Sequence, residues 1–454
     1  MRDFFSDALS EVPTINDRQD STSSSDWRLA SGPEVPAERA ADLKEPFQTA
    51  WYLSLQMTPD EVGQLLHLSR ATVYRHLKTA EIEGLLQTEP RCALPTGSGA
   101  SELMASVLMK DKGEEVRAAF PREIAPAEVL VVPTGGLAEH APPDRVIAER
   151  VSRTAARRLA VAMLVDTRTV GIAYGHHCRY LSAALPGGIT QRLPREAAKR
   201  CQFFPMVGSL GATEVAEDLK LPEASAESNA IRATHNMETY GVEPSDENET
   251  KLKRPPQITQ PCVIADEVAG DRDLLKAAWR ILSMDASIQT IFGRTWCDRH
   301  REGSDMRVPD GEGGLLHRAH CLVTGIGDLE QSRMLALTEL YPLLGELARQ
   351  AGACADICGY MFCGRDDYEQ NRDNLAKVNR RIVAPTLEDY IQATQRARLR
   401  SEGLGTFVIA SGGGEPEFSQ AKARAIAAAI SHGAINILCI DEMIAKALVS
   451  QRQA

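Results

Sequence analysis

Apolar positions between residues 58 and 86 recur at helical spacing and predict two short helices joined by a tight turn. Thr58 and Glu61 form a capping box, in which the threonine caps the first helix and the glutamate reaches back to the cap amide. Pro59 suits the first turn of that helix. After a short break, Ser69 is a good N-cap for the second helix. The apolar side of the first helix consists of Val62, Leu65 and Leu66.

The second helix presents polar and basic side chains at its N-terminal end. Val73 and Leu77 lie four residues apart and face inward, which leaves the neighbouring side chains pointing elsewhere. Helix pairs of this kind place side chains in the DNA major groove. The candidate DNA-binding residues are Ser69, Arg70, Ala71, Thr72, Tyr74, Arg75, His76 and Lys78. The alternative is an ordinary amphipathic helix pair inside a helical core.

The charge distribution favours an anionic partner for this second helix. The chain of 454 residues has 51 basic and 62 acidic residues and a formal net charge of -11. Between residues 69 and 78, however, there are three basic residues and no acidic one. A negatively charged protein that keeps acid away from one helix preserves that helix for contact with an anion such as DNA.

The flanking segments complete a predicted three-helix head at residues 39–90. Residues 1–38 are expected to form a disordered tail, because their Ser, Pro, Glu and Ala residues bury little apolar surface. Phe47, Trp51 and Leu55 then form an apolar stripe that would cover the back of the helix pair. Trp51 is therefore interpreted as a core residue and not as a base-stacking one.

After a linker and connecting helix predicted at residues 91–125, the pattern changes to short apolar runs that are followed by helical segments. Most runs end in Gly or Asp, which is typical of a parallel α/β sheet. Because 454 residues are too many for one compact core, residues 126–454 are predicted to form a separate α/β domain. The six predicted strands are residues 129–132, 170–173, 203–208, 321–324, 406–410 and 435–440.

Glycine-containing turns at the strand ends predict a ligand site. In open parallel sheets, ligands bind outside the carboxyl ends of the strands. Glycines there let backbone amides approach a ligand, and a helix N-terminus favours an anion such as phosphate. The turns concerned are residues 174–177, 208–211, 325–327 and 411–414.

The remaining charged and metal-binding residue types indicate no separate site. Arg150, Arg153 and Arg157 recur along a helix predicted at residues 146–163 and are interpreted as a solvated face. The histidines and cysteines lack the spacings of a metal site or redox pair, so no metal, cofactor or disulfide is expected. No apolar run approaches the ~18–20 residues that cross a bilayer, and the N-terminus lacks signal-peptide features. The expected location is the cytoplasm.

Four stretches of the chain resemble the SorC/DeoR-type bacterial sugar-sensing transcriptional regulators. They are LSRATVYRHLKTAEIEGLL in the head, VGIAYGHH, GACADICGYMF, and KARAIAAAISHGAINILCIDEMIAKAL near the end, and the resemblance spans residues 50–449. It implies a helix-turn-helix head and an effector domain with the fold of sugar-phosphate isomerases and deaminases. It also implies DNA binding modulated by a small, phosphorylated sugar or polyol, and assembly as a dimer or tetramer.

The same resemblance assigns effector-binding residues. Tyr174 to His177 stand where the family has Trp, Gly, a basic residue and Thr, so the glycine is kept and the two histidines differ. Asp356 resembles an aspartate that faces sugar hydroxyls, and Lys422 resembles a lysine near the effector. In the head, the family has glycine where His67 stands. Together with the strand-end turns, the predicted effector-binding residues are Gly175, His176, His177, Gly208, Ser209, Gly325, Gly327, Asp356 and Lys422.

The sequence therefore predicts a ligand-responsive, DNA-binding transcriptional regulator that is not an enzyme. One alternative is an enzyme similar to sugar-phosphate isomerases or deaminases with an appended helix-turn-helix, in which Asp356 and Lys422 would be acid/base partners. A second alternative is a module whose helix pair binds another protein.

Overall fold

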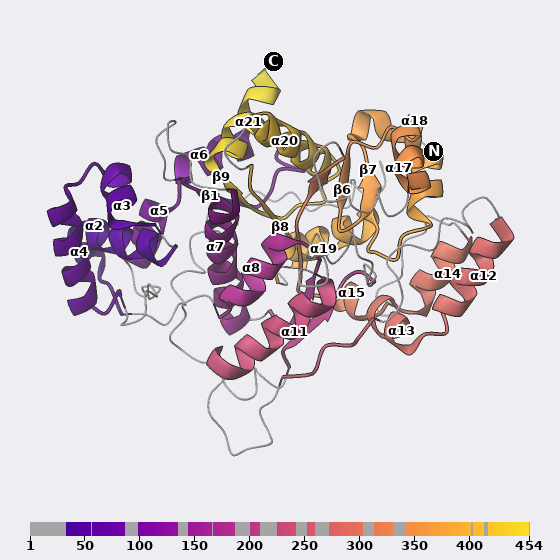
Figure 1. Cartoon of the computed structure of the whole chain (residues 1–454), viewed down its shortest axis with the longest axis horizontal. Coiled ribbons are helices and arrows are strands. Elements are labelled where there is room, and N and C mark those ends of the chain that lie inside the picture. The colour runs from indigo at the N-terminus through magenta and orange to yellow at the C-terminus, as the bar shows by residue number, and fades with distance from the viewer. Residues whose placement is uncertain are drawn as a thin grey trace.

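An N-terminal helical head and a larger α/β domain lie side by side in the computed structural model (Figure 1). Among the described residues, the head is built from helices and the larger domain contains a parallel sheet, so the predicted fold class is confirmed. The structure describes residues 33–55, 57–86, 99–134, 144–165, 167–186, 200–208, 225–241, 252–258, 272–302, 313–329, 342–400, 403–412 and 416–453.

Three helices build the head: α2 (Ala37–Ser54), α3 (Pro59–Leu66) and α4 (Arg70–Ile82). The predicted capping box is present at the start of α3. The Thr58 hydroxyl accepts a hydrogen bond from the Glu61 amide, and the Glu61 carboxylate accepts one from the Thr58 amide. Helix α2 packs against both other helices. The fully buried side chains of the head include Phe47, Trp51, Val62 and Val73.

The turn between α3 and α4 passes through a left-handed residue. His67 has a φ of 55° and a ψ of 40°, a conformation that glycine adopts at little cost and other residues adopt rarely. The Leu68 amide donates to the Gly63 carbonyl at 2.7 Å and closes the end of α3. A Cβ at Gly63 would lie 2.9 Å from the Leu68 carbonyl oxygen, so the tightness of this turn depends on that glycine.

Two short helices connect the head to the sheet. Helix α5 (Ala100–Val107) packs on α2, where the Tyr52 hydroxyl donates to the Val107 carbonyl at 3.2 Å and the Gln48 amide donates to the Ser106 carbonyl at 2.7 Å. Helix α6 (Lys110–Ala118) packs on the first strand of the sheet.

The core of the α/β domain is a six-stranded sheet with the order β1-β9-β8-β4-β2-β3. Every neighbouring pair is parallel, so the carboxyl ends of the strands meet at one edge. All six predicted strands are confirmed, with ends that differ by a few residues. The strands are β1 (Glu128–Val132), β2 (Thr169–Ile172), β3 (Gln202–Pro205), β4 (Cys321–Thr324), β8 (Gly405–Ala410) and β9 (Ile437–Asp441).

Helices pack against the strands of this sheet. Those in contact with it, besides α6, are α7 (Asp144–Val165), α8 (His176–Ala184), α11 (Ala226–Asn236), α15 (Leu315–Arg318), α19 (Leu387–Arg400) and α21 (Glu442–Gln453). Helix α20 (Pro416–Ser431) packs on α21. The other described helices are η3 (Met237–Gly241), α12 (Arg272–Leu282), α13 (Ala286–Phe292), α14 (Arg294–Glu302), α17 (Pro342–Gln350) and α18 (Arg365–Asn379).

A second, antiparallel sheet is not predicted by the sequence pattern. It consists of β5 (Gly327–Asp328), β6 (Ala355–Ile357) and β7 (Tyr360–Phe362). Strands of this length show no detectable period. In this sheet Gly327 pairs with Asp356, so the β6–β7 hairpin lies beside the glycine turn that follows β4.

The interpretation of the α7 arginines as a solvated face is wrong. Arg150 is 1% exposed and Arg157 is 4% exposed, and Arg153 is partly buried. Arg150 and Arg157 contact residues of the head. A polar stripe faces solvent only where nothing else covers the helix, and its period cannot show whether another domain does so.

Most of the tail predicted at residues 1–38 lies outside the described residues, as does Ser209. Within the described ranges, no helix is both long enough and apolar enough to cross a bilayer. The cysteines in those ranges are free thiols.

We expect His67→Gly to stabilise the head by about 0.5–1 kcal/mol, because glycine removes the strain of a left-handed side chain at a modest entropic cost. Chemical denaturation followed by helical circular dichroism measures the change. His67→Ala keeps the Cβ and serves as the control, for which no gain is expected. Equal or lower stability of His67→Gly would show that the histidine side chain itself stabilises the turn.

Candidate functional site

The first candidate site is the outer face of α4. The Ser69 hydroxyl accepts from the Thr72 amide at 3.2 Å and caps the helix, as predicted. Val73 and Ala80 are buried against the rest of the head, which turns the opposite face outward. Tyr74 is 50% exposed and lies on this outward face. The other exposed candidates on this helix are Arg70, Ala71, Arg75 and Lys78, and Thr72 is partly exposed.

His76 does not belong to this outer face. It is 9% exposed, and its Nε2 lies 3.4 Å from the Glu45 carboxylate of α2. Its predicted role in DNA contact is therefore corrected to a contact between helices inside the head. The reason is geometric, because residue 76 follows Val73 by three positions and shares its inward-facing side.

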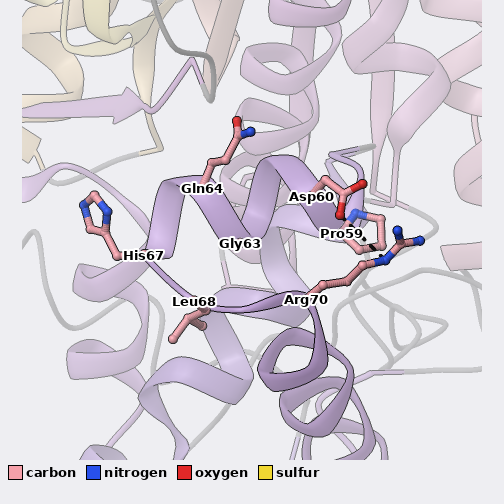
Figure 2. Close-up of a pocket in the computed structure, with 7 residues that line it drawn as sticks. All are labelled: Pro59, Asp60, Gly63, Gln64, His67, Leu68 and Arg70. Atoms are coloured by element: carbon pink, nitrogen blue, oxygen red, sulfur yellow. Dashed lines mark ion pairs between the residues drawn. The ribbon is translucent and has the colours of Figure 1, made fainter.

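A shallow hollow of about 500 Å³ lies beside this face, between α3 and the start of α4 (Figure 2). Asp60 and Arg70 stand at one end of it and form an exposed ion pair with an Nε–Oδ1 distance of 3.6 Å. The Arg70 guanidinium also lies 5.9 Å from the centre of the Tyr74 ring. Arg70 is thus held near the helix N-terminus by weak contacts that a stronger anion can replace. The lining residues are Pro59, Asp60, Gly63, Gln64, His67, Leu68 and Arg70.

The second candidate site is a cluster of buried charged residues near the carboxyl ends of β2, β4 and β8. We call Asp328, Asp356 and Lys422 the strand-end cluster. They are 3%, 4% and 7% exposed. The Lys422 ammonium interacts electrostatically with both carboxylates and donates to the Ile326 carbonyl at 2.7 Å.

Asp356 is fixed by partners from two segments. Its Oδ2 accepts from the Tyr174 hydroxyl at 3.3 Å and from the Gly359 amide at 3.0 Å. Burial raises the pKa of Asp356, although the Gly359 amide and Lys422 act in the opposite direction. Burial also lowers the pKa of Lys422, against the attraction of Asp328 and Asp356. Burial therefore disfavours the charged forms of Asp356 and Lys422, whereas the attraction between them favours those forms.

The turn after β2 reaches the turn after β8. His177 Nε2 lies 2.9 Å from the Ser411 hydroxyl. Gly175 has a φ of 106°, so the glycine of this turn is required by the backbone. His176 begins α8, and its ring stacks on that of Tyr180 at 6.0 Å.

The structure thus brings most of the predicted effector-binding residues to one edge of the sheet. Gly325 lies in the turn that joins β4 to β5, and Gly327 is the first residue of β5 and pairs with Asp356 of the strand-end cluster. Gly208 follows β3, and its amide donates to the Val383 carbonyl at 3.3 Å; no described contact joins it to the cluster. Asp356, Lys422 and His177 were predicted as single residues, and Ser411 was predicted only as part of the turn at residues 411–414. Asp328 was not predicted. The available signal for Asp328 was a charged residue directly after a glycine turn at a strand end.

Asp441 at the end of β9 is an N-cap, as its position between strand and helix indicates. Its Oδ1 accepts from the Ile444 amide at 2.9 Å, and its Oδ2 accepts from the Gly412 amide in the turn after β8. Burial raises the pKa of Asp441 to about 6, although these amides lower it. The amide of Gly412 is therefore already occupied by a carboxylate of the chain itself.

The chemistry of the strand-end cluster suits recognition of a small hydroxyl-rich molecule. Carboxylates accept hydrogen bonds from hydroxyl groups, and a lysine ammonium donates to hydroxyl or anionic oxygens. Among the described residues, no group of His, Cys, Asp and Glu has the arrangement of a metal site.

Comparisons with known proteins give structural likenesses only. No family model matches the chain, and no curated protein matches it. The full-length sorbitol operon regulator SorC from Klebsiella pneumoniae is 12% identical, with a TM-score of 0.46 and coverage of 90% of this chain and 99% of that chain. A DeoR family transcriptional regulator from Listeria monocytogenes is 13% identical, with a TM-score of 0.45 and coverage of 75% and 98%.

A transcriptional regulator from Streptococcus pneumoniae TIGR4 is 14% identical, with a TM-score of 0.46 and coverage of 76% of this chain and 99% of that chain. Of these solved structures, one is described as a SorC regulator and another as a DeoR family regulator.

We expect Asp441→Asn to flatten the pH dependence of stability between pH 4 and 7. The folded pKa of about 6 lies above the ordinary value of 3.8, so the folded state binds this proton more tightly and stability falls as pH rises through that window. The loss is about 3 kcal/mol at neutral pH. Asparagine keeps an oxygen acceptor and carries no charge. Urea denaturation at several pH values measures the slope, with the exposed Glu369→Gln as the control. An unchanged slope would contradict this assignment.

Proposed function

We propose that this chain is a transcriptional regulator that binds double-stranded DNA through α4 and responds to a small ligand at the strand-end cluster. The observation that carries the proposal is the outer face of α4, which offers basic and hydroxyl side chains at the start of a helix in a three-helix head. Side chains at this end of a second helix reach base edges and phosphates when the helix enters the major groove. The proposed contacts are Ser69, Arg70, Ala71, Thr72, Tyr74, Arg75 and Lys78.

The proposed ligand is a sugar or polyol, with or without a phosphate group. The support is the pairing of buried carboxylates with one lysine at the carboxyl edge of a parallel sheet. Gly175, His176, His177, Gly208, Ser209, Gly325 and Gly327 are proposed to line the same site. A single head offers few contacts, so we further propose that the α/β domains assemble as a dimer or tetramer and pair the heads on one operator.

DNA as the partner is tested by salt dependence. A duplex selected by the wild-type protein from a random-sequence library provides the probe. Affinity for DNA falls steeply with added salt, because each phosphate contact releases counterions. An affinity for the duplex that does not change with salt would count against phosphate contacts and would favour a protein partner for the helix pair. Steady turnover of sugar phosphates by the purified chain would favour the enzyme alternative.

Arg75→Ala is expected to lower the affinity for the selected duplex about tenfold or more, because one good base contact contributes about 1–3 kcal/mol. Arg75 is exposed on α4, so the fold should not change. Gel shifts measure the affinity, and the melting temperature checks the fold. Arg145→Ala, on the surface of α7, is the control, since its side chain is 77% exposed and far from α4 in sequence. Unchanged affinity would contradict the proposed docking of α4.

Asp356→Asn is expected to abolish the response to ligand and to leave DNA binding intact. Asparagine retains an acceptor for the Gly359 amide and removes the charge that attracts Lys422. A thermal-shift screen of sugars, sugar phosphates and polyols identifies compounds that bind the folded wild-type chain. A variant that keeps the wild-type melting shift with such a compound would show that the ligand site lies elsewhere. Glu346→Gln, on the exposed part of α17, is the matched surface control.

A further inference from the structure

Helix α7 of the α/β domain holds the head through two buried arginines. Arg150 donates to the Glu61 carboxylate on α3 at 3.2 Å. Seven residues further along α7, Arg157 donates to the Ser54 hydroxyl at the end of α2 at 2.5 Å. The Arg157 guanidinium also lies 4.0 Å from the centre of the Trp51 ring. Two turns of one helix therefore contact the first two helices of the head.

Glu61 has two tasks in this contact. One carboxylate oxygen accepts from the Thr58 amide and closes the capping box of α3, and the other accepts from Arg150. Burial would raise the pKa of Glu61, but the Thr58 amide and Arg150 outweigh it and lower that pKa. The carboxylate that completes the capping box of α3 is thus also bound to Arg150 of the other domain.

Arg150 depends on this carboxylate for its charge balance. It is 1% exposed, and its second described partner is the Thr134 carbonyl at 2.7 Å, which carries no charge. In the described part of the chain, Glu61 is the carboxylate within ion-pair distance of Arg150. A buried cation is strongly destabilising without a counter-charge. The ion pair with Glu61 therefore ties the buried charge of Arg150 to the position of the head.

The other side of α7 leads toward the strand-end cluster. Helix α8 packs along α7, and α8 begins at His176, directly after the turn whose Tyr174 contacts Asp356. A ligand that moved this turn would move α8 against α7. The carbonyl of Thr134 that Arg150 contacts also follows β1, so Arg150 joins the sheet to the head.

We propose that Arg150 and Arg157 form a charged joint through which the ligand state of the strand-end cluster sets the position of the head. This inference rests on the proposed function. Water can solvate the charged side chains of this interface when the head moves away from α7. The joint is therefore suited to two positions of the head and not to permanent attachment. Coupling through it is reciprocal, so DNA bound to α4 must also alter the turn at residues 174–177.

The test compares hydrogen exchange of four full-length chains. Arg150→Met removes the ion pair and keeps the apolar stem, and Glu61→Gln removes the charge while keeping a side chain suited to the capping box. Arg158→Met is the matched control, since Arg158 is a 3% exposed arginine of α7 that pairs with Glu128 inside the α/β domain at 2.9 Å. The wild-type chain is the reference, and no ligand is present.

Without DNA, Arg150→Met and Glu61→Gln are expected to exchange the amides of residues 59–82 about tenfold faster than the wild-type chain, and Arg158→Met is expected to leave them unchanged. Equal acceleration in Arg158→Met would show general loosening of α7 and overturn the proposal. Unchanged exchange in both joint variants would overturn it as well. If Arg150→Met does not fold, Glu61→Gln, which leaves α7 intact, decides the result.

The second arm adds the duplex selected by the wild-type chain. DNA is expected to change exchange at residues 174–184 at least about twofold in the wild-type and Arg158→Met chains, and to leave it unchanged in Arg150→Met. Protection of α4 by DNA in every chain shows that the head still binds. No protection in any chain would reject the proposed function, and the arm without DNA would still decide whether the joint exists. If DNA changes exchange at residues 174–184 in Arg150→Met as much as in the wild-type chain, the proposed role of the joint is wrong.

Discussion

A guanidinium group that is 1% exposed requires a counter-charge, and Arg150 of α7 finds it on the head in Glu61. Many other features of the molecule follow from this contact. The Glu61 side of α3 faces α7 in this contact, and the N-terminal end of α4 is exposed. Nearby, Arg157 covers Trp51, so the aromatic core of the head is closed in part by a side chain of the other domain.

Because Arg150 needs the Glu61 carboxylate, the head is held against α7 and is not connected to the α/β domain by the chain alone. Its hydrophobic core of Phe47, Trp51, Val62 and Val73 is formed within the head, yet one edge of that core is polar and matched to α7. Such an edge holds its partner in a defined orientation, because ion pairs and hydrogen bonds depend on direction and distance. On the outer face of α4, the pair of Arg70 and Asp60 is weak and exposed, so another anion can replace Asp60.

The strand-end cluster is built from segments far apart in the chain. The parallel sheet brings the turns after β2, β4 and β8 to one edge, and the β6–β7 hairpin adds Asp356. Burial makes the charges of Asp328, Asp356 and Lys422 depend on one another.

The sequence by itself determined the local structure of this protein. The capping box at Thr58, the cap at Ser69 and the six apolar strands were all readable, because caps and periods of burial arise from neighbours along the chain. The resemblance to regulators also placed Asp356 and Lys422 in one site. Only the tertiary structure decided that His76 turns inward, that Asp328 joins the cluster, and that Arg150 and Arg157 contact the head. Those three outcomes depend on which surfaces meet, and a charged residue carries the same local pattern whether it faces water or a partner domain.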